Sequence, residues 1–447
     1  MQHRSRMPVA VIGAGVAGLT AAAFLRRHNV PVVLYEASKQ ISGLAASFYD
    51  DEGFSYDFGA HFVTNRLAAA IGIGDRCRDV HHYGETVFLR GRKHSYPFGL
   101  AALPRFAASA LRSRAATWVG VEGRKPTTAA EWFRARYGAA LADEVTLPLV
   151  EAWSGTTASE LAPSVGEKLQ ANALGHAIFL KLAARWTGRA VANGYSHEMP
   201  ESPHVWHVYP QGGVSLLCRK LAEGLHDSIR LESPVEQILV DRGEAVAVRA
   251  NGVEQPVSAV VSTAPCSVLP KLLRGSNELD YLASFRYRPM IFVNLRFHGR
   301  GLLPDTVLWI PEGQFPFFRL TEATLSMPWL APPGKTLITA DIGAVVGDTA
   351  WTSADDQLGE LCVEHLLPLI PDARSRYLGC HVLRTPFAYP VYHKGYEADR
   401  IRFESSIAIS GLYSIGRNGE FAHILMEDVY WRTLKRMRQA LVTRGEQ

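Results

Sequence analysis

The sequence predicts a mixed α/β protein whose parallel sheet is assembled from separate segments of the chain. Residues 9–35 read as strand, glycine-rich turn, helix and strand, which is the order of a parallel βαβ unit. Strand-like sequence returns near Trp206 and reaches another apolar run at residues 259–265. A last strand and a long helix follow residue 400. At 447 residues the chain exceeds one ordinary core, so we expect two domains.

The first βαβ unit is defined by its apolar pattern. Val9–Ile12 is apolar and mostly β-branched, which favours a buried strand. Residues 19–25 then place apolar side chains at the spacing of one helical face. Residues 30–35 form the second apolar run, which predicts the second strand of the unit.

The turn of this unit carries a nucleotide-binding motif. Gly13, Gly15 and Gly18 form GxGxxG between strand and helix, where a tight turn lets backbone N–H groups and the helix dipole hold a pyrophosphate. Glu36 ends the second strand about 20 residues on, where a carboxylate accepts hydrogen bonds from both ribose hydroxyls. The plainer alternative, a glycine-rich turn without a ligand, does not explain this acid. The motif therefore predicts a dinucleotide site.

The rest of the chain divides into returns to this domain and excursions from it. We expect residues 1–67, 205–266 and 400–447 to form the dinucleotide domain, with a hairpin turn at residues 241–243. Residues 68–204 are rich in Ala, Leu and Arg and show helical periodicity, as in EKLQANALGHAIFLKLAARW, so this insertion is predicted to be largely helical. Residues 267–399 mix strands such as MIFVNLRF and TLITADIG with a helix near residues 358–367. The two insertions are predicted to form an α+β substrate domain.

Composition excludes several classes of function. The net charge of +4 is too small for a nucleic-acid-binding surface, so we expect no nucleic-acid partner. The five cysteines are scattered without CxxC or Cys/His spacing, so neither a disulfide framework nor a metal site is expected. No stretch reaches the roughly 18 apolar residues of a membrane-spanning helix. Glycines interrupt the first apolar run, which favours a cytoplasmic protein over a secreted one. The sequence predicts no particular oligomeric state.

Residues 90–125 are strongly basic. Eight Lys or Arg residues stand against the single acid Glu122 and are interleaved with Phe and Leu. A basic amphipathic helix of this kind can lie on an anionic membrane surface. The interpretation that we favour is a solvated helix that packs on its own domain, which leaves peripheral membrane contact open.

The segment after Glu36 carries a family resemblance. EASKQISGLAASFYDDEGFSYDFGAHFVTN resembles the extension found in the superfamily of flavin amine oxidases, protoporphyrinogen oxidases and phytoene desaturases, although Ser42-Gly43 replaces the GG pair of that family. The resemblance implies a Rossmann-type, glutathione-reductase-like domain that binds FAD non-covalently. It assigns FAD contacts to Gly13, Gly15, Ala17, Gly18, Glu36, Ala37, Gly43, Leu44, Gly59, Ala60, His61, Val235, Gly416, Arg417, Phe421, Met426 and Glu427.

The C-terminal segment GRNGEFAHILMED resembles the ending of UDP-galactopyranose mutase, and FGAHFVTN, FFRLTE and FAYPVYH resemble further mutase segments. This resemblance implies that Arg319 and Tyr389 bind the substrate and that His61 lies beside the flavin, so these three are the candidate catalytic residues. Val63 and Glu427 depart from the mutase pattern. The expected function is therefore FAD-dependent oxidation of a C–N or C–C bond in a small organic substrate, by hydride transfer to the flavin. The alternative is a non-redox mutase acting on a nucleotide sugar.

Each candidate also has a plainer interpretation. His61 could be a core histidine that donates to a carbonyl. Arg319 lies among apolar residues, so it either pairs with Glu322 or faces an anion, and we favour an anionic substrate. Tyr389 could be an aromatic residue that packs on a sheet. Cys266 is predicted to be a packed thiol.

Overall fold

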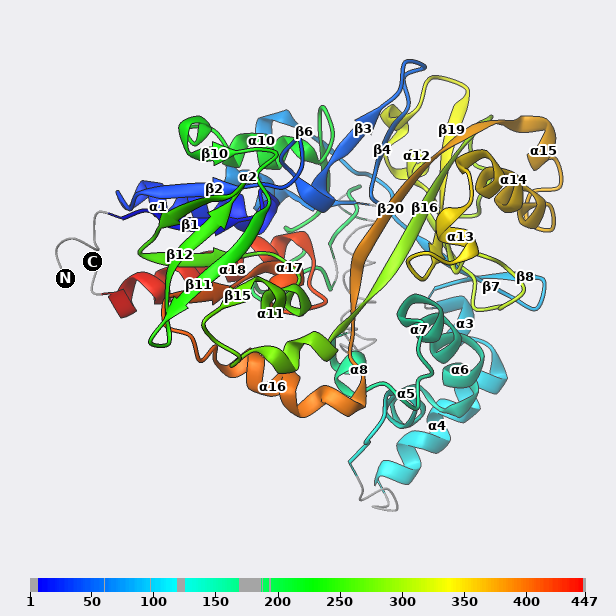
Figure 1. Cartoon of the computed structure of the whole chain (residues 1–447). Coiled ribbons are helices and arrows are strands. Elements are labelled where there is room, and N and C mark those ends of the chain that lie inside the picture. The colour runs from blue at the N-terminus through cyan, green and yellow to red at the C-terminus, as the bar shows by residue number, and fades with distance from the viewer. Residues whose placement is uncertain are drawn as a thin grey trace.

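The computed structural model describes residues 7–59, 61–96, 98–118, 125–168, 186, 188–192 and 194–444. Within these residues it shows a mixed α/β fold with five sheets, which confirms the predicted class (Figure 1). Most of the predicted helix EKLQANALGHAIFLKLAARW falls in residues 169–185, outside the described residues. None of the helices in the described ranges is long and apolar enough to cross a membrane.

A five-stranded parallel sheet unites three distant parts of the chain. Its order is β10 (Ile229–Arg230), β2 (Val32–Tyr35), β1 (Val9–Ile12), β14 (Ala259–Ser262) and β21 (Leu412–Ser414). Because side chains alternate along a strand, β1 sends Val9 and Val11 into one core, and Ala10 and Ile12 into another. The sheet is therefore buried on both faces.

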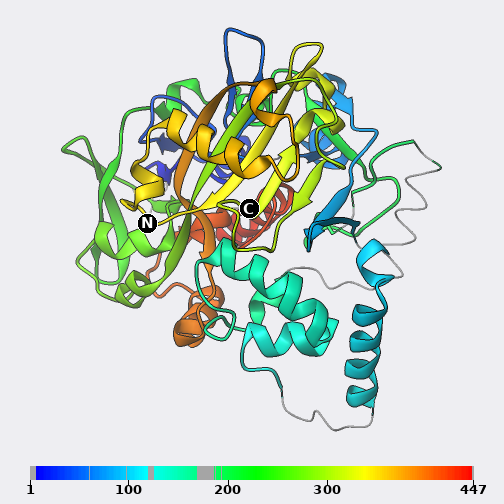
Figure 2. The same cartoon turned by 90° about the vertical axis from the view of Figure 1, so that its right-hand side faces the viewer.

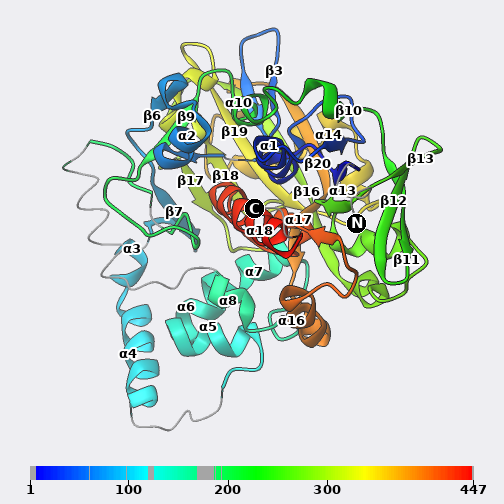
Figure 3. The same cartoon turned by 90° about the vertical axis from the view of Figure 1, so that its left-hand side faces the viewer.

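Helices cover one of these faces. They are α1 (Val16–Arg27), α2 (Asn65–Ile71), α10 (Ser215–Leu221) and α18 (Met426–Arg444). Figure 3 shows α1 beside α18 on this side of the molecule. The opposite face packs against a second sheet, whose strand order is β13 (Val253–Pro256), β12 (Glu244–Ala250), β11 (Val235–Asp241) and β15 (Leu273–Arg274). The short helix α11 (Leu269–Leu272) packs in the same core. The hairpin between β11 and β12 confirms the turn predicted at residues 241–243.

The largest sheet has seven strands in the order β20 (Tyr377–Val391), β16 (Arg286–His298), β19 (Lys335–Gly343), β18 (Arg319–Glu322), β17 (Val307–Trp309), β7 (Glu85–Leu89) and β8 (Arg92–Ser95). The predicted strands MIFVNLRF and TLITADIG are β16 and β19. One face packs on α14 (Asp355–Leu366), close to the predicted helix. Since β7 and β8 come from the first insertion, both insertions contribute to this sheet.

The remaining elements connect these sheets. Two small sheets pair β3 (Ser47–Tyr49) with β4 (Ser55–Asp57), and β5 (Val63–Thr64) and β6 (Cys77–Asp79) with β9 (His207–Pro210). Short helices are α12 (Ala323–Ser326), α13 (Thr349–Thr352), α15 (Ala373–Arg376), α16 (Glu397–Ser405) and α17 (Gly416–Gly419).

The helices of the first insertion lie at one side of the molecule (Figure 2). They are α3 (Phe98–Ala101), α4 (Pro104–Trp118), α5 (Ala129–Tyr137), α6 (Ala139–Leu141), α7 (Leu147–Ser154) and α8 (Ser164–Lys168). The basic segment 90–125 is helical only in part, because α4 is a mostly exposed helix that packs on α5 and α6, as we favoured, whereas the start of the segment is not helical. Its first basic residues, Arg90, Arg92 and Lys93, belong to the β7–β8 hairpin, and α4 begins only at Pro104.

Candidate functional site

The glycine-rich turn after β1 has both the tight packing and the open face that a phosphate needs. A Cβ at Gly18 would lie 1.9 Å from the Gly13 carbonyl oxygen, and Gly13 has a φ of +97°. At Gly15 the nearest atom to a Cβ is the Ser42 carbonyl oxygen, 3.9 Å away, so the loop is open there. Gly15 is the N-cap of α1 and no side chain caps it. The first backbone N–H groups of α1 are therefore placed to hold an anion.

Glu36 lies beside this turn, as the motif predicts. Its carboxylate accepts hydrogen bonds from the backbone N–H of Ala14 (2.7 Å) and from the N–H and hydroxyl of Ser38 (2.9 and 2.8 Å). The carboxylate is thus fixed at the end of β2. Ser42, with a φ of +99°, donates its N–H to the Ala14 carbonyl at 2.9 Å. This bond brings the Ser42-Gly43 pair against the turn, although the segment lacks the second glycine.

Three further residues predicted to contact FAD lie near this turn and differ in their exposure to solvent. Gly43 and Ala37 are exposed, and Leu44 is half-buried. Gly43 also approaches the turn closely, because a Cβ on it would lie 3.6 Å from the Gly15 Cα. These residues therefore border the open side of the turn, where a nucleotide could bind.

The turn α17 brings the C-terminal segment to the same helix. Gly416 has a φ of +80°, and a Cβ on it would lie 2.6 Å from the Cβ of Ala17 in α1. Glycine is required at this close approach. Met426 begins α18 a few residues later and is half-buried. The structure thus brings the first and last predicted cofactor segments together.

Arg417 points from α17 into the interior without a carboxylate partner among the contacts of the described residues. Its guanidinium donates to the carbonyls of Ile424 (2.7 Å) and Ala388 (3.1 and 3.2 Å). It also lies over the ring of Tyr389, 5.2 Å from the centroid. Burial lowers the pKa of Arg417, and the nearby tyrosines oppose that shift. A half-buried cation held only by carbonyls has a positive charge to offer a ligand.

Arg319 lies in β18 and pairs with Asp341 of β19 at 2.5 Å. Glu322, the alternative partner considered from the sequence, does not pair with Arg319. Its fully buried carboxylate instead accepts bonds from the backbone of Gly301 and Leu303 at 2.8 and 2.7 Å, and from Thr336. Burial would lower the pKa of the Arg319 guanidinium, but Asp341 beside it raises the pKa above its usual value. Arg319 is thus charged and keeps 19% of its side-chain surface accessible.

His61 lies near both arginines. Burial, then the charges of Arg417 and Arg319, lower its pKa to about 4, so the imidazole is neutral at pH 7. Its Nδ1 atom has no hydrogen-bond partner and lies 3.9 Å from the Asp57 carboxylate. The structure therefore shows no carbonyl that accepts from this nitrogen. The side chain keeps 23% of its surface accessible, although it lies deep in the protein.

Aromatic side chains complete the site. Tyr389 in β20 contacts Trp153 of α7 and His423, with ring centroids 5.5 and 5.3 Å apart. Tyr83 donates its hydroxyl to Glu85 at 2.5 Å. Burial raises the pKa of the Tyr83 phenol, and the nearby charge of Arg319 opposes that rise.

Tyr83 and Trp153 were missed from the sequence, since neither lies in a motif. Their aromatic side chains were the only signal in the sequence. That signal is not specific, because most aromatic residues in the described part of the chain pack in the hydrophobic core. The structure therefore brings together all three candidate catalytic residues and adds two neighbours.

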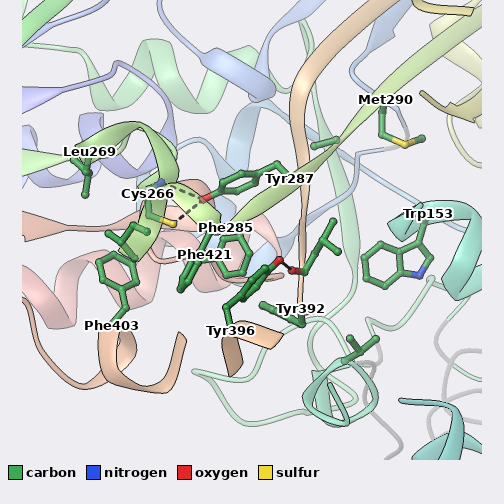
Figure 4. Packing of buried hydrophobic residues seen from close by; sticks show 14 of the residues in the cluster. Trp153, Cys266, Leu269, Phe285, Tyr287, Met290, Tyr392, Tyr396, Phe403 and Phe421 are labelled. Carbon is green, nitrogen blue, oxygen red and sulfur yellow. Dashed lines mark hydrogen bonds between the residues drawn. The ribbon is translucent and has the colours of Figure 1, made fainter. Parts of the chain in front are cut away.

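Three predicted cofactor residues are occupied by packing. The ring of Phe421 is buried among Phe285, Tyr287, Tyr392 and Tyr396 (Figure 4). The carboxylate of Glu427 is fully buried and accepts bonds from Thr64, Arg66 and Trp431. Val235 begins β11 and is half-buried. These side chains are engaged in contacts within the protein. Any contact of Phe421 with a cofactor would therefore involve its backbone.

Several other expectations concern neighbouring residues. Ala60 lies outside the described residues. Cys266 is buried, and burial raises the pKa of its thiol to about 12, which confirms a packed thiol. No three His, Cys, Asp or Glu side chains in the described part of the chain are grouped to hold a metal ion.

Comparisons with known proteins identify the family. The sequence model of the flavin-containing amine oxidoreductases matches residues 16–430. Coproporphyrinogen III oxidase of Staphylococcus aureus is 22% identical over 432 residues, which cover 87% of this chain and 89% of that protein. The structure of reduced UDP-galactopyranose mutase is similar, with a TM-score of 0.78, 19% identity, and coverage of 98% of this chain and 96% of that one. Cyclohexylamine oxidase of Brevibacterium oxydans IH-35A has a TM-score of 0.71 at 14% identity, with 98% of this chain and 100% of that chain covered.

Proposed function

Because this chain belongs to the flavin-containing amine oxidoreductase family and is an FAD-dependent oxidoreductase, we propose that it oxidises a C–N or C–C bond of a small anionic substrate. The site of reaction in this proposal is the place where His61, Arg319, Tyr389 and Arg417 meet. The observation that carries it is the convergence of these residues from four distant segments around partly accessible surface. Arg417 supports the proposal, because its cation has no carboxylate partner among the described residues and is held by carbonyls alone.

In this proposal the FAD lies along the Rossmann-type domain formed by residues 1–67, 205–266 and 400–447, and residues 68–204 and 267–399 form the substrate domain. The fit rests on the glycine-rich turn. Its packed side requires Gly13 and Gly18, while its open side at Gly15 leaves space for a pyrophosphate. Glu36 would hold the ribose and the α17 turn would lie near the flavin. Since the described residues offer no recognisable attachment site, FAD binds non-covalently.

The protein supplies charge and orientation to the reaction. When bound, FAD takes up the two electrons that leave the substrate. Arg319 and Arg417 together carry two positive charges, and Asp341 neutralises one of them. The remaining charge favours an anionic group on the substrate. Tyr389 and Trp153 pack against its apolar part, and the neutral His61 accepts a hydrogen bond from the substrate.

Anaerobic stopped-flow absorbance of the purified yellow protein tests this proposal. Carboxylated amines, porphyrinogens and polyene acids are mixed with the oxidised enzyme, each beside its uncharged ester. We expect one acid to bleach the flavin band and its ester to bleach it at least tenfold more slowly, because the ester lacks the charge that Arg417 attracts. Equal rates for acid and ester would contradict the anionic substrate.

The second candidate is a mutase-like reaction of a nucleotide sugar without net oxidation. Two arginines beside a tyrosine are suited to a diphosphate, which is the observation that favours it. It predicts no bleaching by any substrate and isomerisation of the sugar only after reduction with dithionite. Bleaching by a substrate of the first screen would exclude it.

A further inference from the structure

Asp57 is a buried carboxyl group next to the candidate site, and the sequence analysis assigns it no role, although it lies in the segment after Glu36. It ends β4 and is 6% exposed. Its two oxygens accept hydrogen bonds from the hydroxyl groups of Ser47 (2.6 Å) and Tyr209 (2.8 Å). Three elements therefore fix the carboxyl group, since Ser47 lies in β3 and Tyr209 in β9.

This fixed carboxyl group faces an imidazole that lacks a partner. The Oδ2 atom of Asp57 lies 3.9 Å from the Nδ1 atom of His61, and Nδ1 is buried without a hydrogen bond. Burial raises the pKa of Asp57 to about 7, so above that pH the group is an ionised carboxylate, and an oxygen that already accepts one bond has a second lone pair. A movement of the ring by less than about 1 Å would complete an N–H to oxygen bond of ordinary length.

The other charged groups near His61 determine which of its two ring nitrogens carries the proton. Arg319 and Arg417 both act on its charge, and neither guanidinium can accept a hydrogen bond. The N–H of a neutral imidazole is therefore stabilised toward Asp57, and its lone pair toward the arginines. Both effects favour the same tautomer.

We infer that Asp57 is a positioning residue that holds His61 in the Nδ1–H tautomer and leaves Nε2 as an acceptor toward the substrate. The tautomer itself follows from the contacts of the protein alone. Its value for catalysis rests on the proposed function, in which His61 accepts a hydrogen bond from the substrate. The inference adds Asp57 to the candidate site as a residue that acts through His61.

Nitrogen NMR of the FAD-loaded enzyme with ¹⁵N-labelled histidine tests the tautomer at pH 7.5. The signals of His61 are identified by their loss in His61→Gln. We expect wild-type His61 to carry its proton on Nδ1 and Asp57→Asn to lower the fraction of His61 in that tautomer, because either end of a neutral amide accepts an N–H less strongly than an ionised carboxylate does. An unchanged fraction of this tautomer in Asp57→Asn would overturn the inference, as would an Nε2-protonated His61 in the wild type.

Asp305→Asn is the matched control. Asp305 contacts the exposed His82 at 2.8 Å, so this variant makes the same chemical change beside another histidine. It should leave the His61 signals unchanged. With a substrate found by the flavin-bleaching screen, Asp57→Asn should slow flavin reduction ten- to hundredfold with little change in substrate affinity, and Asp305→Asn should not.

The two readouts separate the two claims. If no substrate bleaches the flavin, the proposed function fails while the NMR spectrum still reports the tautomer. Suppose instead that a substrate bleaches the flavin and that it reduces the flavin of Asp57→Asn at the wild-type rate. The positioning role of Asp57 then fails, while the proposed function stands.

Discussion

Two glycines of the same turn should fail in different ways when each is replaced by alanine. A methyl group at Gly18 would meet the Gly13 carbonyl oxygen at 1.9 Å and its carbon at 3.0 Å. Both atoms are backbone, so no rotamer change relieves the contact. At Gly15 the φ of −80° suits alanine and the nearest atom is 3.9 Å away.

Gly18→Ala is therefore a folding variant, with a loss of about 3 kcal/mol in the free energy of unfolding, the upper end of ordinary overpacking. Gly15→Ala should change the stability of the FAD-free protein by less than about 0.5 kcal/mol. Its methyl group would nevertheless separate the first backbone N–H groups of α1 from a phosphate. Losing one charge-assisted hydrogen bond costs about 1.5–3 kcal/mol, which is roughly a ten- to hundredfold weaker affinity for FAD.

Urea unfolding of the FAD-free proteins and titration of each with FAD measure the two effects separately. Gly91→Ala is the control, because Gly91 has a φ of +72° and nothing within 4 Å of its Cβ. It should show only backbone strain of about 1 kcal/mol and normal FAD affinity. Wild-type FAD affinity in Gly15→Ala would refute the position that we assign to the pyrophosphate.

Three further predictions concern other parts of the structure. Arg319→Met should lower the free energy of unfolding by about 3–5 kcal/mol because it leaves Asp341 charged and buried, and Arg319→Met/Asp341→Leu should recover much of this loss in urea unfolding without recovering activity. The pKa of the buried His207 is lowered by burial to about 4, so the unfolded chain binds more protons between pH 4 and 6.5 and stability rises with pH across that window. His207→Phe should flatten that rise by up to roughly 3 kcal/mol, and an unchanged slope would show that His207 is not buried in its neutral form. Acid precipitation should release the flavin, and a pellet that stays yellow would contradict non-covalent binding.

The parts of the site that the sequence predicted are local ones. Gly13, Gly15 and Gly18 lie within six residues, and Glu36 follows one helix and one strand later. Their relative positions are set by the geometry of a single βαβ unit, so spacing alone was sufficient to bring Glu36 to the turn.

The partner of Arg319 could not be found in this way. Arg319 and Glu322 are three residues apart in β18, and side chains in a strand alternate, so the two point to opposite faces. Asp341 lies directly opposite Arg319 on the neighbouring strand and therefore on the same face. This register depends on the pairing of β18 with β19, which no local pattern specifies.

The basic segment shows a signal that was present and overlooked. Leu89 pairs with Arg92 across a two-residue turn in which Arg90 and Gly91 have φ values of +54° and +72°. This is a type I′ turn, which suits the twist of a hairpin. Gly91 between two basic residues is a hairpin signal, but the surrounding charge pattern favoured a helix. This hairpin extends the sheet of β17 and β18. In the proposed site, it thereby places Tyr83 near Arg319.

In the proposed function, Arg417 joins the packing of the fold to its chemistry. The turn that carries it is held by the Tyr287 hydroxyl, which donates to the Asn418 carbonyl, and by the Asn418 amide, which donates to the Phe387 carbonyl at 3.3 Å. The carbonyls of Ala388 and Ile424 then fix the guanidinium itself. A chain that needed only stability would place a carboxylate here or an apolar side chain, because a half-compensated buried cation opposes folding. Rigid support of an unneutralised charge is instead what electrostatic preorganisation requires, since the negative charge arrives with the ligand and no protein group has to move to receive it.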